Sequence, residues 1–463
     1  MYTTRALADY VRSFQPEELS PAARNAAGRC VLDLMTAAIA GLASGGARAA
    51  RRTALALYAP GESTVWFTRR RLKAPGAALA NCAAASMLDL DDGHRAACGH
   101  PGSAVIPAAV AVAEEIDAGA GDLLAAIAVG YEVAVRVAAA RDLSALGAYS
   151  SGTWCGYGAV AAAGWLRRSP PDRLAHAFAI SGVSAPNQAA AGSSGYSKLT
   201  GNTVKEGIPW ATVTGLTALG LAEAGFTGPD DILDHSPYFD AARILDGLGR
   251  GLVIEQTYFK PYSACRWTHA AVDGIGALMD EHGLAASDLA GVEIHTFTRA
   301  LRLANRRDPA TLEDAQYSLP YCVALRAVAG ADALLPLTED ALRRPDVVAL
   351  AETVTLHLDS ALDRRFPATT PARIVLRTAK GRLERLVDSP RGDPGNPVSP
   401  EELEAKFRIA TRALMRREDQ EEMLAAVDSL VAGDLSPLLR ALGRPLAAVS
   451  TEATISREEQ EKT

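Results

Sequence analysis

Three carboxylates and two histidines lie within twelve positions of one short segment, residues 88–103. They are Asp89, Asp91, Asp92, His94 and His100. Carboxylates and imidazoles are the usual groups for proton transfer and for metal binding. The segment joins two alanine-rich apolar runs, and loops placed by rigid flanking elements are where binding and catalysis concentrate. The first question is which of these two chemistries the segment performs.

Standard metal sites do not fit the spacing. In a calcium-binding loop that starts at Asp89, positions five, six and twelve are Gly93, His94 and His100, where Asp or Asn, Gly and Glu are required. A zinc-binding helix needs two histidines four residues apart, whereas these two are six apart and Pro101 interrupts any helix. A nonstandard metal site and a solvated acidic turn remain alternatives to proton transfer.

Two further segments carry reactive side chains just before a predicted helix. Residues 193–202 place Lys198 among glycines, where a lysine at a helix N-terminus could hold a carboxylate. Residues 258–269 hold Lys260, Tyr262, Cys265, Arg266 and His269. Arg266 could bind a carboxylate through two parallel hydrogen bonds. The alternatives are a surface lysine in a loop and a structural histidine.

Composition excludes several classes of protein. The 463 residues carry a net charge of −7 with scattered basic residues, so no nucleic-acid footprint is present. No glycine-rich phosphate loop and no Gly-x-Ser-x-Gly motif occurs. The six cysteines are far apart, which is typical of free thiols in a reducing compartment. Charges interrupt the most apolar windows, 30–42 and 123–140, so we predict a soluble cytoplasmic protein that does not associate with a membrane.

The pattern of apolar residues predicts the elements that position these groups. Alanine-rich helical patterns cover 22–43, 77–90, 105–118, 122–140, 156–166, 170–181, 203–224 and 240–248. After residue 285 the pattern alternates, which predicts strands at 292–297 and 353–358 and a hairpin over 372–387. The predicted fold class is mainly α. A large all-α domain is formed by both chain ends, 1–268 and 398–463, and a smaller α/β (α+β) domain spans 269–397.

At these residues the chain resembles the MmgE/PrpD family, which contains 2-methylcitrate dehydratase, cis-aconitate decarboxylase and iminodisuccinate epimerase. The resemblance rests on several blocks in family order: Asp89-x-Asp91-Asp92, His100-Pro101-Gly102-Ser103, Gly130-Tyr131-Glu132-Val133, Lys198-Leu199, Gly225-Phe226-Thr227-Gly228-Pro229, Lys260 to His269 and Tyr317 to Tyr321. It implies that the smaller domain is a lid, that the chain forms a homodimer, and that the active site lies in the cleft and needs no cofactor or metal.

The resemblance also assigns residues. Asp89 and His100 match the family's acidic and histidine active-site positions, Lys198 its flexible-loop lysine and Lys260 its cleft lysine. We expect His100 to be the main acid/base, with Asp89 orienting it or sharing the proton, and with His269 as a second relay or an anchor. Lys260 belongs to the same catalytic group. The expected substrate-binding residues are Lys198, Arg266, Cys265, Asp92, Ser150 and Tyr317.

Three positions depart from the decarboxylases of the family. Cys265 and Ser150 stand where those enzymes have histidines, and Gly93 stands at a threonine position. These departures count against cis-aconitate decarboxylation and do not select among the remaining reactions of the family. Our first expectation is a hydro-lyase that acts on a polycarboxylate such as 2-methylcitrate, by proton transfer at a carbon next to a carboxylate. The alternatives are an epimerase, isomerase or decarboxylase of a related di- or tricarboxylic acid, and a polycarboxylate-binding protein without catalysis.

Overall fold

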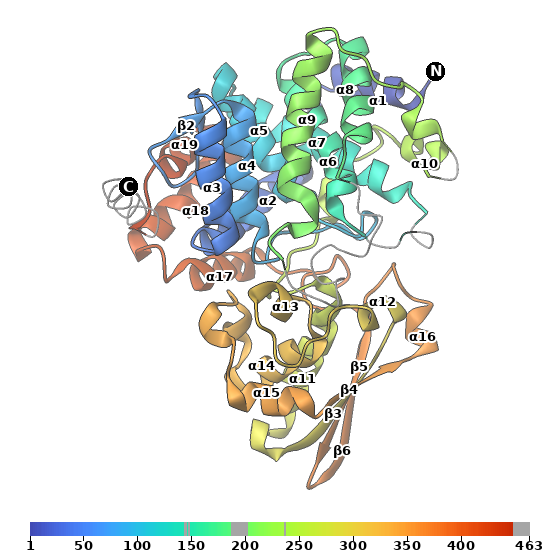
Figure 1. Ribbon diagram of the computed structural model, residues 1–463, viewed down its shortest axis with the longest axis vertical. Coiled ribbons are helices and arrows are strands. Elements are labelled where there is room, and N and C mark those ends of the chain that lie inside the picture. The colour runs from blue at the N-terminus through green and yellow to red at the C-terminus, as the bar shows by residue number, and fades with distance from the viewer. Residues whose placement is uncertain (143–145, 147–148, 187–201, 236–237, 448–463) are drawn as a thin grey trace.

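Alanine-rich helices fill the upper part of the molecule, and a small sheet with its own helices fills the lower part (Figure 1). The computed structural model describes all residues except 143–145, 147–148, 187–201, 236–237 and 448–463. The helices of the upper part are α1 (Thr3–Ser13), α2 (Pro21–Gly41), α3 (Gly45–Leu57), α4 (Ala74–Ser86), α5 (Gly102–Ile116), α6 (Ala120–Ala139), α7 (Cys155–Leu166), α8 (Pro171–Val183), α9 (Ile208–Glu223), α10 (Ala241–Leu245), α17 (Pro400–Thr411), α18 (Arg417–Ala432) and α19 (Ser436–Leu442).

These helices pack closely because their contact faces carry small residues. A Cβ at Gly41 of α2 would lie only 2.1 Å from the Ala84 carbonyl oxygen of α4. All residues of α4 except Pro75 are buried. The buried apolar side chains form one cluster, the first core, which draws on residues 7–259 and again on 403–446. The last three helices therefore pack with the N-terminal part of the chain.

The lower part is built on a four-stranded mixed sheet with the strand order β4-β3-β5-β6. The strands are β3 (Leu289–Thr296), β4 (Val354–Leu358), β5 (Ala372–Thr378) and β6 (Gly381–Val387). β3 pairs parallel with β4 and antiparallel with β5, which pairs antiparallel with β6. The helices of this part are α11 (His269–His282), α12 (Thr298–Leu301), α13 (Leu312–Gln316), α14 (Leu319–Ala329), α15 (Pro345–Glu352) and α16 (Ser360–Asp363).

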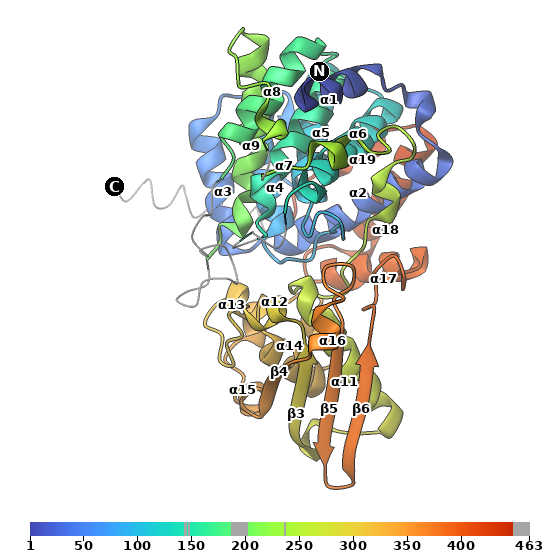
Figure 2. The same cartoon turned by 90° about the vertical axis from the view of Figure 1, so that its right-hand side faces the viewer.

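α11 packs against β5 and β6 (Figure 2). A Cβ at Gly274 of α11 would lie 2.5 Å from Cδ1 of Ile374 in β5, so the glycine permits close contact between helix and sheet. Val292, Ile294 and Ile374 of the sheet are fully buried. With residues of α11 and α14 they form the second core, which spans 264–376 and also takes in Tyr149.

The fold class predicted from the sequence is wrong in its stated form. The helical part is not all-α, because β1 (Ser63–Thr64) and β2 (Arg71–Leu72) form a two-stranded antiparallel sheet within it. The Glu114 carboxylate of α5 accepts hydrogen bonds from the backbone nitrogen and the hydroxyl of Thr64 and so fixes β1. Strands of two residues are too short to show alternation. Helices, short 3-10 turns included, make up 59% of the described residues, and this ribbon and the small mixed sheet supply the strands.

Among the described residues, no single helix is both long and apolar enough to cross a membrane. The pair α2 and α3 meets the length and composition of a span only when the two are taken together, and the pair bends by 95° at its break. Both helices contribute buried residues to the first core.

Candidate active site

The loop between α4 and α5 carries the acidic and histidine residues, and alternate side chains anchor it. Leu88 and Leu90 are buried in a small apolar cluster with Ala37 of α2, Leu335 and Ala410 of α17. Asp89, between these anchors, and Asp91, after them, face a charged centre. The loop ends where Pro101 starts α5.

His100 lies at the middle of this centre and is 9% exposed. Its Nδ1 lies 3.0 Å from the Asp92 carbonyl oxygen and 3.4 Å from Asp91 Oδ2, while its Nε2 lies 3.6 Å from Asp89 Oδ1. The carbonyl accepts a hydrogen bond from Nδ1, so the proton on that nitrogen is fixed. Ser103 donates a hydrogen bond to Asp91 from the first turn of α5. The imidazole therefore has a set orientation.

Two lysines from distant segments converge on Asp89. Lys205, just before α9, and Lys260 each place Nζ 3.6 Å from Asp89 Oδ1, and Lys260 Nζ is 3.9 Å from Asp91 Oδ1. Both ammonium groups are buried. Lys205 also donates to Gln316 Oε1 at 3.0 Å and lies over the Tyr317 ring, 5.4 Å from its centroid. Gln316 and Tyr317 belong to the second core region, so the centre lies between the two cores.

Several residues at the centre have left-handed backbone conformations that non-glycine residues rarely adopt. Asp89 has φ 52°, and Lys205 and Glu206 have φ 47° and 58°. Such conformations cost roughly 1–3 kcal/mol each and gather at functional sites, where the surrounding structure holds them. At Lys205 the turn aims the side chain toward Asp89 instead of along α9. Asp89 and Lys205 thus combine a strained backbone with membership of the charge cluster.

The charges shift one another's pKa values. Burial and Lys260 lower the pKa of His100, but Asp91 and Asp89 outweigh them and raise it to about 9. Burial would raise the pKa of Asp89, but Lys260, Lys205 and His100 bring it below its ordinary value. His100 and Lys260 likewise hold the pKa of Asp91 low against burial. At neutral pH the centre therefore holds an imidazolium and two carboxylates.

Two atoms of the centre have no hydrogen-bond partner among the described residues although both are buried. They are Lys260 Nζ and Asp89 Oδ2. Leaving a buried charged group unpaired is costly, and native structures retain such groups where a ligand pairs with them. With His100 protonated, three cations face two carboxylates, so the centre has an uncompensated positive charge. The centre is therefore suited to bind an anionic ligand that can give up a proton.

The same side chains include a possible metal-ligand set. One ligand atom each from Asp89, Asp91 and His100 lies within 4.8 Å of the others. The ammonium groups of Lys205 and Lys260 already lie 3.6 Å from the Asp89 carboxylate. Repulsion from these two charges disfavours a further cation at this place. The donor set is therefore better suited to holding protons and an anion.

Asp92 points away from this centre into the first core. Its carboxylate accepts hydrogen bonds from Tyr131 Oη at 2.5 Å and from the Gly102 backbone nitrogen at 3.1 Å. Burial and the Asp33 carboxylate raise the pKa of Asp92 to about 7. Its expected role in substrate binding stays a prediction, and these contacts favour a role in holding the start of α5.

Replacing Asp92 by asparagine is expected to make stability less dependent on pH. A carboxyl whose pKa is raised by folding stabilises the protein at low pH and loses that contribution as pH rises through about 7, at about 1.4 kcal/mol per pH unit. The stability of Asp92→Asn relative to the wild type should therefore grow by roughly 3 kcal/mol from pH 5 to pH 8. Urea unfolding at several pH values measures this, with Asp428→Asn on the exposed face of α18 as control. A constant difference between Asp92→Asn and the wild type would contradict the raised pKa.

A small cavity of about 30 Å³ opens beside His100. Its lining includes charged or polar residues and a set of mostly aromatic residues. They are His94, Arg95, Cys98, Glu206 and Arg266, together with Tyr149, Tyr258, Cys265, Trp267, Tyr317 and Phe366. This volume holds about two water molecules. A polycarboxylate is larger, so binding requires the walls to move apart.

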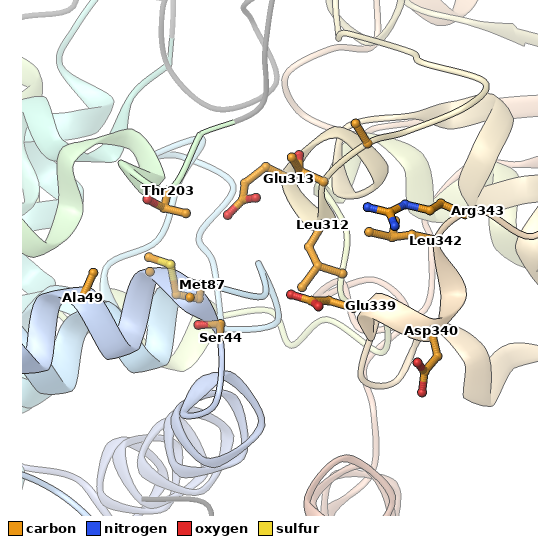
Figure 3. Close-up of a pocket in the computed structure, with 14 residues that line it drawn as sticks. Ser44, Ala49, Met87, Thr203, Leu312, Glu313, Glu339, Asp340, Leu342 and Arg343 are labelled. Carbon is orange, nitrogen blue, oxygen red and sulfur yellow. The ribbon is translucent and has the colours of Figure 1, made fainter. Parts of the chain in front are cut away.

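A larger cavity of about 540 Å³ lies between α3 and residues 310–313 and 339–343. Figure 3 shows Ser44, Met87 and Thr203 on one side of it and Glu313 and Arg343 on the other. None of the paired groups around His100 lines it. We place the chemistry at the smaller cavity because the buried ionised groups and the unpaired atoms are there.

The other residues predicted from the sequence divide by their contacts. Cys265 and Tyr317 line the small cavity. Arg266 donates to Asp393 Oδ1 and to the carbonyl oxygens of Pro390 and Arg391, so most of its donors are used within the protein.

His269 and His94 have both ring nitrogens occupied. His269 accepts a hydrogen bond from Arg266 and donates to the Ala264 carbonyl oxygen. His94 accepts from the Ala96 backbone nitrogen and donates to the Val253 carbonyl oxygen. Burial lowers the pKa of both imidazoles, to about 4 for His94. These contacts favour the anchor role for His269 over the relay, which stays a prediction.

The two remaining predicted residues are Ser150 and Lys198. Ser150 is buried at the start of a short turn, and its carbonyl oxygen accepts from the Thr153 hydroxyl. Lys198 lies outside the described residues. Their substrate-binding roles stay predictions.

Sequence reasoning missed Asp91 and Lys205 as members of the site. Asp91 lies between Asp89 and Asp92, which were both predicted as site residues. It differs from Asp92 in the direction in which its side chain points. Lys205 lies in Lys205-Glu206-Gly207-Ile208-Pro209, where a lysine and a glutamate come directly before a helix with proline at its second position. Ionisable residues at such a helix start are the pattern that could have found it.

Gly93 explains one departure from the family pattern. A Cβ at this position would lie 2.3 Å from Tyr258 Oη, and the two residues also exchange backbone hydrogen bonds of 3.0 and 2.9 Å. The tyrosine ring therefore fills the space that a side chain at position 93 would need. The glycine and Tyr258 together reshape this wall of the cavity.

Comparison with known proteins identifies the family of this chain. The MmgE/PrpD N-terminal domain model matches residues 5–244 and the MmgE/PrpD C-terminal domain model matches residues 262–431. The chain is 25% identical to the cis-aconitate decarboxylase-like protein oryM of Aspergillus oryzae over 473 aligned positions, which cover 94% of this chain and 96% of that protein. The two domain models together span most of the sequence, and the chain belongs to the MmgE/PrpD family.

Proposed function

We propose that this protein is a lyase that dehydrates a small polycarboxylate such as 2-methylcitrate. One observation carries the proposal: in a buried centre, a protonated His100 and the Lys260 ammonium each lie 3.6 Å from Asp89 Oδ1, while Asp89 Oδ2 and Lys260 Nζ have no hydrogen-bond partner among the described residues. Family membership and the name of the A. oryzae relative support an enzyme of the dehydratase or decarboxylase type. The choice of dehydration and of the substrate is the proposal.

The arrangement gives each group a role. Asp89 Oδ2 accepts the proton from the carbon next to a substrate carboxylate, and the electron pair of that C–H bond forms the new double bond. His100 donates its Nε2 proton to the hydroxyl that departs from the neighbouring carbon as water. Lys260 and Lys205 stabilise the negative charge that develops on the carboxylate. Such preorganised charges in a water-poor site supply the largest part of many rate enhancements.

Decarboxylation is the second candidate, because the A. oryzae relative is named as decarboxylase-like. In that reaction the bond to the departing carboxylate breaks, carbon dioxide leaves, and His100 protonates the carbon that keeps the electron pair. Cys265, Ser150 and Gly93 depart from the residues expected of decarboxylases, as argued from the resemblance above. These departures place dehydration first.

Product analysis by NMR separates the reactions. Purified protein is incubated in deuterated buffer with 2-methylcitrate, citrate or cis-aconitate in separate samples. Dehydration gives an alkene from a hydroxy acid, decarboxylation gives carbon dioxide and a dicarboxylate from cis-aconitate, and epimerisation gives deuterium exchange without net loss of either group. Binding with neither turnover nor exchange would contradict an enzymatic function.

The rate is expected to fall as pH rises through about 9. His100 has a raised pKa, so it is protonated below that value and loses the proton it must donate above it. The measurement is the pH profile of kcat with the substrate found above. In His100→Gln this alkaline limb should disappear together with most of the activity. A rate that instead rises through pH 6 to 7 and stays high to pH 10 would make His100 a base.

A further inference from the structure

We propose that Arg95 and Arg266 form a second anion-binding subsite, the guanidinium subsite, which binds a carboxylate of the substrate remote from the reacting carbon. The ligand is an ionised carboxylate of a di- or tricarboxylate. The inference rests on the proposed function, because it gives that site its preference for more than one carboxylate. Two guanidinium groups at one wall of the small cavity carry the argument.

The two arginines share a single counter-ion. Arg95 Nη2 lies 2.5 Å from Asp393 Oδ2, and Arg266 Nη2 lies 2.5 Å from Asp393 Oδ1. Among the described residues, no other carboxylate lies within 4.0 Å of either guanidinium. One positive charge is therefore left uncompensated beside the cavity. A partly buried, uncompensated charge attracts an anion more strongly than an exposed one because water screens it less.

Tyr258 holds the two guanidinium groups together. The Arg95 and Arg266 Cζ atoms lie 5.1 and 4.9 Å from the centroid of its ring. Cation–π contact offsets part of the repulsion between the two like charges. The ring can take this place because Gly93 has no side chain there. The missing side chain at position 93 and the arginine pair are thus parts of one arrangement.

Arg95 is the member of the pair that can contact a ligand. Arg266 is 3% exposed and its donors hold Asp393, Pro390 and Arg391. The Arg95 side chain is 17% exposed and lines the cavity, and its buried Nε has no hydrogen-bond partner. When the walls move apart to admit a ligand, this unpaired guanidinium nitrogen becomes a donor for a carboxylate oxygen.

The cavity therefore has two positive walls. His100 with the two lysines behind it forms one, and Arg95 with Arg266 forms the other, and His100 and Arg95 line the same space. A monocarboxylate can pair with only one of them, whereas a di- or tricarboxylate can pair with both. The guanidinium subsite should therefore contribute to the binding of polycarboxylates and not to that of monocarboxylates.

The test compares two saturated ligands that cannot lose water. Tricarballylate has three carboxylates on a propane backbone, and isobutyrate has the same propane backbone with the central carboxylate alone. Isothermal titration calorimetry on the full chain measures both affinities for the wild type and for Arg95→Met. We expect Arg95→Met to weaken tricarballylate binding about tenfold to a hundredfold and to change isobutyrate binding less than twofold. The affinity of Arg95→Lys for tricarballylate should lie between those of the wild type and Arg95→Met, because lysine keeps the charge but lacks the planar guanidinium group.

Arg95→Met should fold, because Asp393 keeps Arg266 at 2.5 Å as its partner. Circular dichroism and thermal unfolding check this. Arg385→Met is the matched control, since Arg385 of β6 forms an exposed ion pair with Glu281 of α11. The subsite is overturned if Arg95→Met loses affinity for both ligands equally, or if it binds tricarballylate within threefold of the wild type.

The same titration of Lys260→Met separates the subsite from the proposed function. If Lys260→Met weakens both ligands and Arg95→Met weakens only tricarballylate, both proposals are supported. If Lys260→Met binds both ligands normally while Arg95→Met loses tricarballylate, the subsite stands and the catalytic centre assigned above fails. Wild-type protein that binds neither ligand overturns both.

Discussion

Replacing Lys260 by methionine is expected to lower kcat about 10²- to 10³-fold. That is the usual cost of removing one charged or hydrogen-bonding group that stabilises negative charge in the transition state. Methionine keeps the length of the side chain in a fully buried position and removes only the charge. The measurement is steady-state kinetics with the substrate identified by product analysis. Lys380→Met, in the exposed turn between β5 and β6, is the control and should leave kcat within twofold.

A second readout distinguishes loss of charge from loss of structure. Lys260 lowers the pKa of His100, so its removal should move the alkaline limb of the residual activity above pH 9. A merely misfolded variant would lose activity without this displacement. Near-wild-type kcat in folded Lys260→Met would remove the lysine from the mechanism.

Replacing Lys406 by methionine is expected to destabilise the protein by about 3–5 kcal/mol, the usual cost of leaving a buried charge without its partner. Lys406 Nζ lies 2.5 Å from Asp33 Oδ1 and donates to the Leu90 carbonyl oxygen at 2.9 Å. Asp33 is fully buried and its Oδ2 already lacks a hydrogen-bond partner. Without the ammonium the carboxylate must be protonated or left unpaired. Urea unfolding at pH 7 measures the loss.

The double variant Asp33→Asn/Lys406→Met tests the cause. Removing both charges should restore most of the stability, because replacing a buried ion pair by neutral groups is often close to neutral. Arg417→Met is the control, since its side chain is 89% exposed and its loss should change stability by less than about 0.5 kcal/mol. If the single and double variants are equally unstable, packing and not charge explains the role of Lys406.

The predictable parts of the fold are those with long, regular patterns. The alternation at 292–297, 353–358 and 372–387 lies where β3, β4, β5 and β6 form, and the helix α17 follows a Ser399-Pro400 start with a capping box. The two-residue strands β1 and β2 show no period, and α5 holds β1 in place, because the Ser63 hydroxyl donates to the Ala111 carbonyl oxygen and the Thr64 backbone nitrogen donates to the Glu114 carboxylate. A contact between segments 50 residues apart leaves no trace in the local pattern.

The candidate site shows the same limit at the level of single residues. Asp89 and His100 lie on one loop, so their spacing already suggested a pair. Asp91 and Asp92 are neighbours in sequence, yet one faces His100 and the other faces Tyr131, because successive side chains of the loop point in different directions. Lys205 reaches Asp89 through a left-handed backbone turn that its side-chain type does not predict.

The ion pair between Asp33 and Lys406 has a consequence for the order in which the protein is made. The two residues are 373 positions apart. During synthesis the N-terminal helices leave the ribosome first, and for most of that time Asp33 has no cation to neutralise it. The loop that bears Asp89 also lacks the hydrogen bond from Lys406 to the Leu90 carbonyl oxygen until α17 has been made. A nascent chain that stops before residue 406 therefore carries nearly every charged group of the centre but not the contact that fixes their loop. Activity should arise only after residue 406 has left the ribosome.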